Sequence, residues 1–103
     1  MTEPAFVGRQ LHFVGIGGVG MSGLALVAHE LGASVTGSDQ ATSTYLDALV
    51  ERGIETKMGN AAEHVPSGAE VVYSTVVPPD NPERRAAAGR DRARRSRLGH
   101  RHL

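Results

Sequence analysis

The sequence predicts an α/β fold: a Rossmann-like parallel sheet of strand order 3-2-1-4 with helices on both faces. Two observations carry this prediction. Short apolar runs alternate with segments of helical periodicity, which is typical of βαβ units with right-handed crossovers. The first apolar run is separated from the first helical segment by the glycine-rich stretch GIGGVGMSG, residues 15–23. A glycine turn between a strand and a helix is where such sheets bind nucleotides.

Length and composition restrict the protein class. The chain has 103 residues, enough for one domain, and 40% of them are hydrophobic. It has no cysteine, which excludes disulfides and thiolate metal sites. No apolar run approaches the length of a membrane span, and residues 1–9 lack the basic start of a signal peptide. We therefore expect a cytoplasmic protein without a membrane partner.

The net charge is zero, but the charges are distributed unequally along the chain. Residues 1–83 hold three basic and ten acidic side chains, whereas residues 84–103 hold eight arginines and one acidic residue, Asp91. We therefore divide the chain into an N-terminal extension (1–9), a Rossmann-like domain (10–83) and a basic C-terminal tail (84–103) that is disordered or irregular. The tail has no aromatic side chains to stack on bases, so we do not expect nucleic-acid binding. An interaction protein acting through the tail is a third alternative to the two functions considered below.

The secondary structure follows from local patterns. We expect strands over residues 11–16, 33–37, 54–58 and 70–77, which are apolar or rich in β-branched residues. Helical spacing of apolar residues predicts a first helix over residues 18–31, with Gly32 just past its end. A second helix should begin after Thr42 or Ser43 as the N-cap and end at Gly53.

Two further helix starts are expected late in the domain. Asn60 and Glu63 have the spacing of a capping box, which predicts a single helical turn through His64. Asn81 followed by Pro82 predicts an N-cap and the first helical position after it.

The glycine stretch is the candidate binding site. Gly15, Gly17 and Gly20 fit the pattern G-x-G-x-x-G, whose glycines allow a tight turn, close approach to a pyrophosphate and close packing of helix on strand. The following helix directs its unpaired N–H groups at the anion. Asp39 lies 19 residues beyond Gly20, the offset at which an acidic residue binds a ribose hydroxyl in NAD-binding folds. From the residues alone, a stand-alone NAD- or nucleotide-binding module is therefore the favoured function.

Several motifs in order add a resemblance to a known family. The strings HFVGIGGVGMSGLA, TGSD, MGN, STVV and PPDNPE, over residues 10–83, resemble the N-terminal domain of the Mur ligases of peptidoglycan synthesis, in particular those that add L-alanine. The resemblance implies a part of an ATP-dependent ligase that joins L-alanine to UDP-N-acetylmuramate, which would be the partner of this domain. Family members use ATP and magnesium, carried by a central domain.

The resemblance also assigns site residues. The UDP diphosphate would lie against Gly15, Gly17, Gly18, Val19, Gly20, Met21 and Ser22. Asp39 would lie near the uridine ribose, and Ser74 and Thr75 would line the same side from the fourth strand. The resemblance assigns no catalytic or metal-binding residue to this chain.

Two departures from the family pattern limit what we expect. Asn60 stands where family members commonly have a histidine near the uracil, and His12, His29 and His64 are isolated and therefore expected to be structural. The chain has one lysine, Lys57, and no G-K-[ST] loop for the ATP phosphates. We therefore expect a fragment that binds substrate, carries no cofactor and turns nothing over alone. Its fourth strand would be an exposed sheet edge, which predicts self-association.

Overall fold

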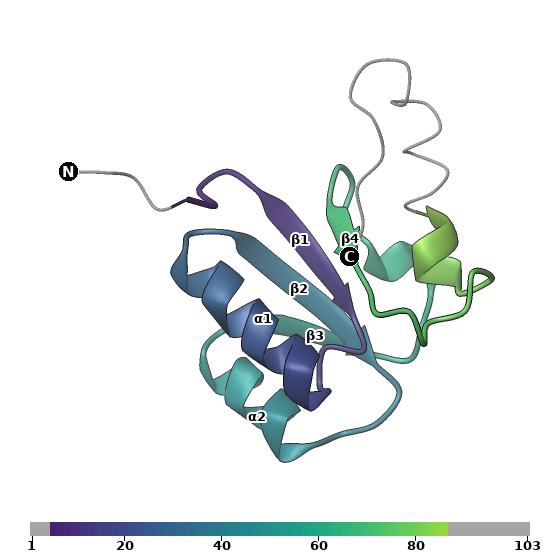
Figure 1. Cartoon of the computed structure of the whole chain (residues 1–103), viewed down its shortest axis with the longest axis horizontal. Helices are drawn as coiled ribbons and strands as arrows, with labels where there is room; N and C mark the ends of the chain where they lie inside the picture. Colours follow the sequence, from purple (N-terminus) through teal and green to yellow (C-terminus); the bar gives the residue numbers. More distant parts are fainter. Residues whose placement is uncertain (1–4, 87–103) are drawn as a thin grey trace.

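The structure is a computed structural model that describes residues 5–86. Its elements are β1 (Gln10–Val14), α1 (Val19–Glu30), β2 (Ser34–Asp39), α2 (Thr44–Glu51), β3 (Glu55–Met58), the 3-10 helix η1 (Ala62–His64) and β4 (Glu70–Val72) (Figure 1). Residues 82–86 are also helical. The expectations for residues 1–4 and 87–103, which include most of the basic tail, lie outside the described residues.

The four strands form one parallel sheet in the order β3-β2-β1-β4 (Figure 1), which confirms the predicted topology. In the register, His12 of β1 lies between Thr36 of β2 and Val71 of β4. Because all strands run the same way, the segments that follow them meet at one edge of the sheet. That edge carries the glycine turn.

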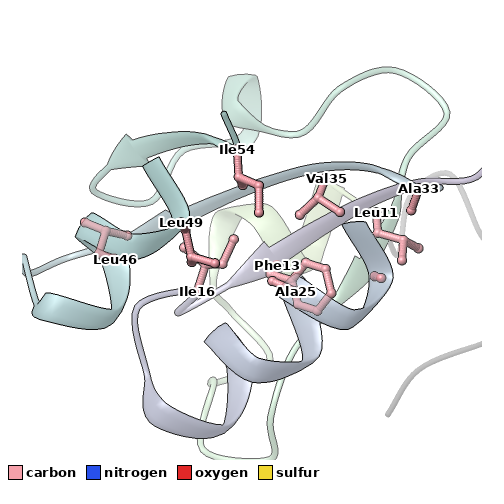
Figure 2. Close-up of a cluster of buried hydrophobic side chains, with 10 residues drawn as sticks. Leu11, Phe13, Ile16, Ala25, Ala33, Val35, Leu46, Leu49 and Ile54 are labelled. Atoms are coloured by element: carbon pink, nitrogen blue, oxygen red, sulfur yellow. The ribbon is translucent and has the colours of Figure 1, made fainter. Parts of the chain in front are cut away.

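The first face of the sheet packs against α1 and α2. Leu11 and Phe13 of β1 point to this face, as the alternation of a strand requires. Figure 2 shows them with Ile16 and with residues of the helices and the neighbouring strands. The buried members of this cluster are Leu11, Phe13, Ile16, Ala25, Ala28, Ala33, Val35, Leu46, Leu49 and Ile54.

The second face is covered by η1, its flanking loops and the helical residues 82–86. Val14 of β1 and Val71 of β4 pack there with Val65, Ala69 and Tyr73, and Ala86 lies against them. Arg84 also contacts this part of the domain, because its guanidinium lies 4.2 Å from the ring centre of Tyr73 and donates to the carbonyl of Val77 at 2.8 Å. Helical segments therefore lie on both faces, as the sequence predicted.

Three of the expected helix ends are confirmed. Ser43 caps α2 by accepting the Leu46 N–H at 3.0 Å. Asn81 accepts the N–H groups of Glu83 and Arg84 at 2.9 and 3.1 Å, as an N-cap does. Gly32 has φ +99°, the left-handed conformation expected just past a helix.

Two local predictions were wrong. The cap of η1 is Ala61 and no side chain caps it, so Asn60 and Glu63 form no capping box. The fourth strand ends at Val72 instead of Val77. β-Branched residues continue past Val72, but β1 ends at Val14, and residues 74–77 form a turn closed by the bond from Val77 N–H to the Ser74 carbonyl at 3.0 Å.

Candidate functional site

The glycine turn connects β1 to α1 and is fastened to β2. Gly15 has φ +75°, a conformation that other residues rarely adopt. The N–H groups of Gly15 and Ile16 both donate to the carbonyl of Ser38, at 2.8 and 3.0 Å. A further bond from Gly18 N–H to the Gly15 carbonyl, at 3.1 Å, closes the turn. The tight-turn role predicted for the first glycine is therefore the one it has.

The start of α1 presents backbone donors at this turn. Gly18 is its N-cap and supplies no side-chain cap. The first helical bond runs from Ser22 N–H to the Gly18 carbonyl at 2.8 Å, so the N–H groups of Val19, Gly20 and Met21 precede the helical ladder. Gly18, Val19 and Gly20 are exposed. Such a helix start combines N–H groups with the positive end of the helix dipole and suits an anion.

Four of the seven residues predicted to bind the diphosphate have backbone N–H groups that are already engaged. Those of Gly15 and Gly18 form the bonds of the turn given above. Gly17 N–H donates to Asp39 Oδ2 at 2.8 Å, and Ser22 N–H belongs to the helical ladder. The Ser22 hydroxyl donates to the Val19 carbonyl at 3.2 Å, and the residue is buried. Among the predicted residues, the N–H groups of Val19, Gly20 and Met21 therefore remain the candidate donors to an anion.

Asp39 lies beside the turn, as its position at the end of β2 predicts. Besides Gly17 N–H, its carboxylate accepts Ala41 N–H at 3.2 Å through Oδ1. Ser43 reaches the same place, since its hydroxyl donates to the Gly17 carbonyl at 3.0 Å. Asp39 as a whole is partly exposed.

The second and third glycines have other packing roles than the pattern predicts. A Cβ on Gly20 would meet nothing within 4 Å, so Gly20 is not required for close packing of helix on strand. A Cβ on Gly17 would lie 3.0 Å from both Asp39 Oδ2 and Ser43 Oγ. Gly17 therefore allows close approach of the loop that follows β2.

Ser74 and Thr75 follow β4 instead of lying on it. Ser74 is half-buried and Thr75 exposed. Because β4 is the parallel neighbour of β1, their segment leaves the sheet at the same edge as the glycine turn (Figure 1). No hydrogen bond among residues 5–86 joins either side chain to the glycine turn or to Asp39.

A buried polar cluster beside the turn was missed by sequence reasoning. The Glu83 side chain is fully buried and accepts four hydrogen bonds. Oε1 accepts from His12 Nε2 at 2.8 Å and from the Ser38 hydroxyl at 2.5 Å. Oε2 accepts from Ala61 N–H and from His64 Nδ1, each at 3.0 Å. His12 and His64 therefore meet at one carboxylate, which their spacing in the sequence does not reveal, and both have the structural contacts that were expected.

The environment of Glu83 favours its charged form. Burial on its own would raise the pKa, but the hydrogen bonds from His12, Ser38, Ala61 and His64 outweigh it and lower the pKa to about 2. With Glu83 ionised, His12 donates through Nε2, and its Nδ1 can then accept from the Thr36 hydroxyl, 2.8 Å away. Every buried side-chain nitrogen and oxygen within residues 5–86 has a partner.

Residues 5–86 contain no group of three or more His, Asp or Glu side chains that could hold a metal ion. The described part of the chain also has no helix long and apolar enough to cross a membrane.

The comparison with known families decides the relationship. Residues 10–98 match the description "Mur ligase family, catalytic domain". The chain belongs to the Mur ligase family. The match continues beyond Glu83, and Arg84 and Ala86 pack on the domain. The division of the chain after residue 83 stays a prediction.

Individual Mur ligases are similar to this chain over most of its length. It is 55% identical to UDP-N-acetylmuramate–L-alanine ligase of Novosphingobium aromaticivorans over 73 residues, which are 71% of the chain and 15% of that protein. The corresponding ligase of Symbiobacterium thermophilum is 48% identical over 94 residues, 90% of the chain and 19% of that protein. The chain thus spans less than a fifth of the length of these Mur ligases.

A solved Mur ligase has the same fold in this region. The crystal structure of UDP-N-acetylmuramate-alanine ligase from Thermotoga maritima superposes with a TM-score of 0.71 and 34% sequence identity, covering 84% of this chain and 19% of that one. The similarity is to the N-terminal domain of such a ligase and does not favour the alternative of a stand-alone NAD-binding module.

Proposed function

We propose that this chain is the part of a Mur ligase that binds the UDP portion of UDP-N-acetylmuramate. The observation that carries the proposal is the uncapped, exposed start of α1 directly after the glycine turn. The diphosphate would accept from the N–H groups of Val19, Gly20 and Met21. The similarity to ligases named for UDP-N-acetylmuramate supports this substrate over NAD.

The nucleoside would extend from this point along the edge of the sheet. Asp39 remains the candidate for the ribose, and it would bind through the oxygen lone pairs that Gly17 and Ala41 leave available. Ser74 and Thr75 remain candidates for the same side, since their segment leaves the sheet beside the glycine turn. Their roles are predictions.

ATP and magnesium would act in parts of the ligase that this chain does not span. The chain lacks a G-K-[ST] loop, and residues 5–86 lack a metal-ligating cluster, so the residues present do not fit either group. We therefore propose substrate binding, without turnover, as the role of this chain. A cytoplasmic location also stays a prediction.

Titration calorimetry with UDP-N-acetylmuramate and with NAD tests the proposal. The first ligand should bind and the second should bind more weakly or not at all. Preference for NAD, or no binding of the UDP-sugar, would contradict the proposed function.

Gly20→Asp tests the position of the diphosphate. A side chain there meets no neighbour, and a carboxylate near a helix start does not destabilise the helix, so the melting temperature should not fall. The charge would face the phosphate, and like charges about 4 Å apart near a protein surface repel by about 4 kcal/mol before screening, so we expect at least about tenfold weaker binding.

Val27→Asp is the matched control. Val27 is exposed on the same helix, two turns further from its start, so the variant adds the same charge away from the proposed phosphate. Equal affinities of the two variants for the UDP-sugar would place the diphosphate elsewhere.

Self-association through the edge of β4 is a separate prediction. Among the described strands, β4 pairs with β1 and presents its other edge to no strand. Analytical ultracentrifugation over a concentration series should show dimers or larger species, and a monomer at all concentrations would contradict it.

A further inference from the structure

We propose that Glu83 is a positioning residue for the proposed diphosphate site: its buried carboxylate holds Ser38 and residues 61–64, and Ser38 in turn holds the glycine turn. This inference rests on the proposed function, because it concerns the same site. It assigns a role to a side chain that would not itself contact the substrate.

Ser38 is the link between Glu83 and the turn. Its hydroxyl donates to Glu83 Oε1 at 2.5 Å, and its carbonyl accepts the N–H groups of Gly15 and Ile16. Side chain and carbonyl belong to one fully buried residue. A displacement of Ser38 therefore moves the acceptor on which the glycine turn depends, and with it the start of α1.

The second carboxylate oxygen of Glu83 binds the segment that follows β3. Oε2 accepts from Ala61 N–H and His64 Nδ1, which follow β3. The end of β2 meets this segment as well, since Gly59 N–H donates to the Asp39 carbonyl at 2.8 Å. One carboxylate thus joins β1 through His12, β2 through Ser38 and the segment after β3.

A role in stability alone does not explain why a charged group occupies this place. Burying a carboxylate costs desolvation free energy, and apolar side chains of similar volume are often at least as stabilising. What the carboxylate adds is four directed acceptor sites, which fix the relative positions of three chain segments. The segments it fixes are the ones that surround the proposed phosphate site.

Glu83→Gln is the informative variant because it keeps the shape and removes one acceptor oxygen. At least one of the four hydrogen bonds that the carboxylate accepts must then rearrange. We expect the Kd for UDP-N-acetylmuramate to rise at least about fivefold, a typical coupling between linked sites. Hydrogen exchange of the Gly15 and Ile16 amides should also accelerate in the free protein. Both measurements use the full chain of residues 1–103, below the melting temperature of every variant.

Two control variants separate positioning from loss of stability. Ile54→Val trims the buried core of the first face and should lower the melting temperature without changing the Kd. Glu70→Gln removes a carboxylate that pairs with Arg9 at 2.9 Å. This pair lies at the amino ends of β1 and β4, away from the glycine turn, so the variant should likewise leave the Kd unchanged. An equal change of Kd in Ile54→Val and Glu83→Gln would overturn the proposal.

Ser38→Ala provides a second test and serves if Glu83→Gln does not fold. It removes the hydroxyl that joins Ser38 to Glu83, so it should raise the Kd and accelerate exchange of the same two amides. In the double variant, the effects of Ser38→Ala and Glu83→Gln on the Kd should be non-additive. The effects of Ser38→Ala and Glu70→Gln on the Kd should be additive. Additive effects in the first pair, or unchanged amide exchange, would refute the link through Ser38.

The exchange measurement also separates a failure of the proposed function from a failure of the positioning role. If the wild-type chain does not bind the UDP-sugar, the proposed function fails, but faster exchange at Gly15 and Ile16 in Glu83→Gln would still support the positioning role. If the wild type binds and neither the Kd nor the exchange responds, the positioning role fails alone.

Discussion

The low pKa of Glu83 predicts how stability depends on pH. A carboxyl with an ordinary pKa of 4.5 in the unfolded chain and about 2 in the folded domain binds its proton more weakly when folded. Its contribution to the free energy of unfolding is therefore fully present above about pH 5 and is lost as the pH falls toward 2. The difference of about 2.5 pKa units corresponds to about 3 kcal/mol, since one unit is about 1.4 kcal/mol.

Urea unfolding measures this contribution. Circular dichroism is the suitable signal, because the chain has no tryptophan for fluorescence. Wild type and Glu83→Gln are compared at pH values from about 2.5 to 7, because the amide that replaces the carboxyl in the variant does not titrate in this range. Carboxyl groups remote from Glu83 affect both proteins alike, so below about pH 5 the change in the difference between their free energies of unfolding reports on Glu83 and its contacts. There the difference should decrease by up to about 1.4 kcal/mol per pH unit.

A difference that stays constant down to about pH 2.5 would contradict the low pKa of Glu83, because it would mean that this carboxyl has the same pKa in the folded and unfolded chain.

Three substitutions test the packing around the glycine turn, each by urea unfolding at neutral pH. Gly37→Ala should destabilise by about 1–3 kcal/mol, because the new Cβ would lie 2.7 Å from Ile16 Cβ; unchanged stability would show that Ile16 moves freely. Gly23→Ala should stabilise by up to about 1 kcal/mol, since its Cβ enters open space within α1, and a loss of stability would contradict that. Ser43→Ala should cost about 1 kcal/mol or more, because Ser43 caps α2 and also donates to Gly17; no loss would mean that water replaces both bonds.

The topology could be predicted because the signals for it are local. Alternating strands and helices with right-handed crossovers determine the strand order, and Ser43 and Asn81 determine helix starts through contacts two or three residues away. The end of β4 could not be predicted in this way. Its sequence favours a strand as far as Val77, but a strand also needs a partner, and β1 turns away at Gly15.

The glycine turn could be predicted as a candidate site, whereas the buried Glu83 cluster beside it could not. An acidic residue just after Asn-Pro is ordinarily a solvated residue of a first helical turn, so nothing local marks Glu83 as buried. Its partners His12, Ser38 and His64 are 71, 45 and 19 residues away. Only the folded arrangement brings them together, and each histidine considered alone has no distinguishing pattern.

The late position of Glu83 in the sequence has a consequence for synthesis. A ribosome produces β1, β2 and β3 before the carboxylate that His12, Ser38 and Ala61 require. Until that residue emerges, water must solvate these donors and the second face of the sheet stays uncovered. The domain therefore completes its packing only after its strands have been made. The N-terminal strands would then remain accessible to chaperones during translation, and arrested nascent chains ending before and after residue 83 would differ in their resistance to protease.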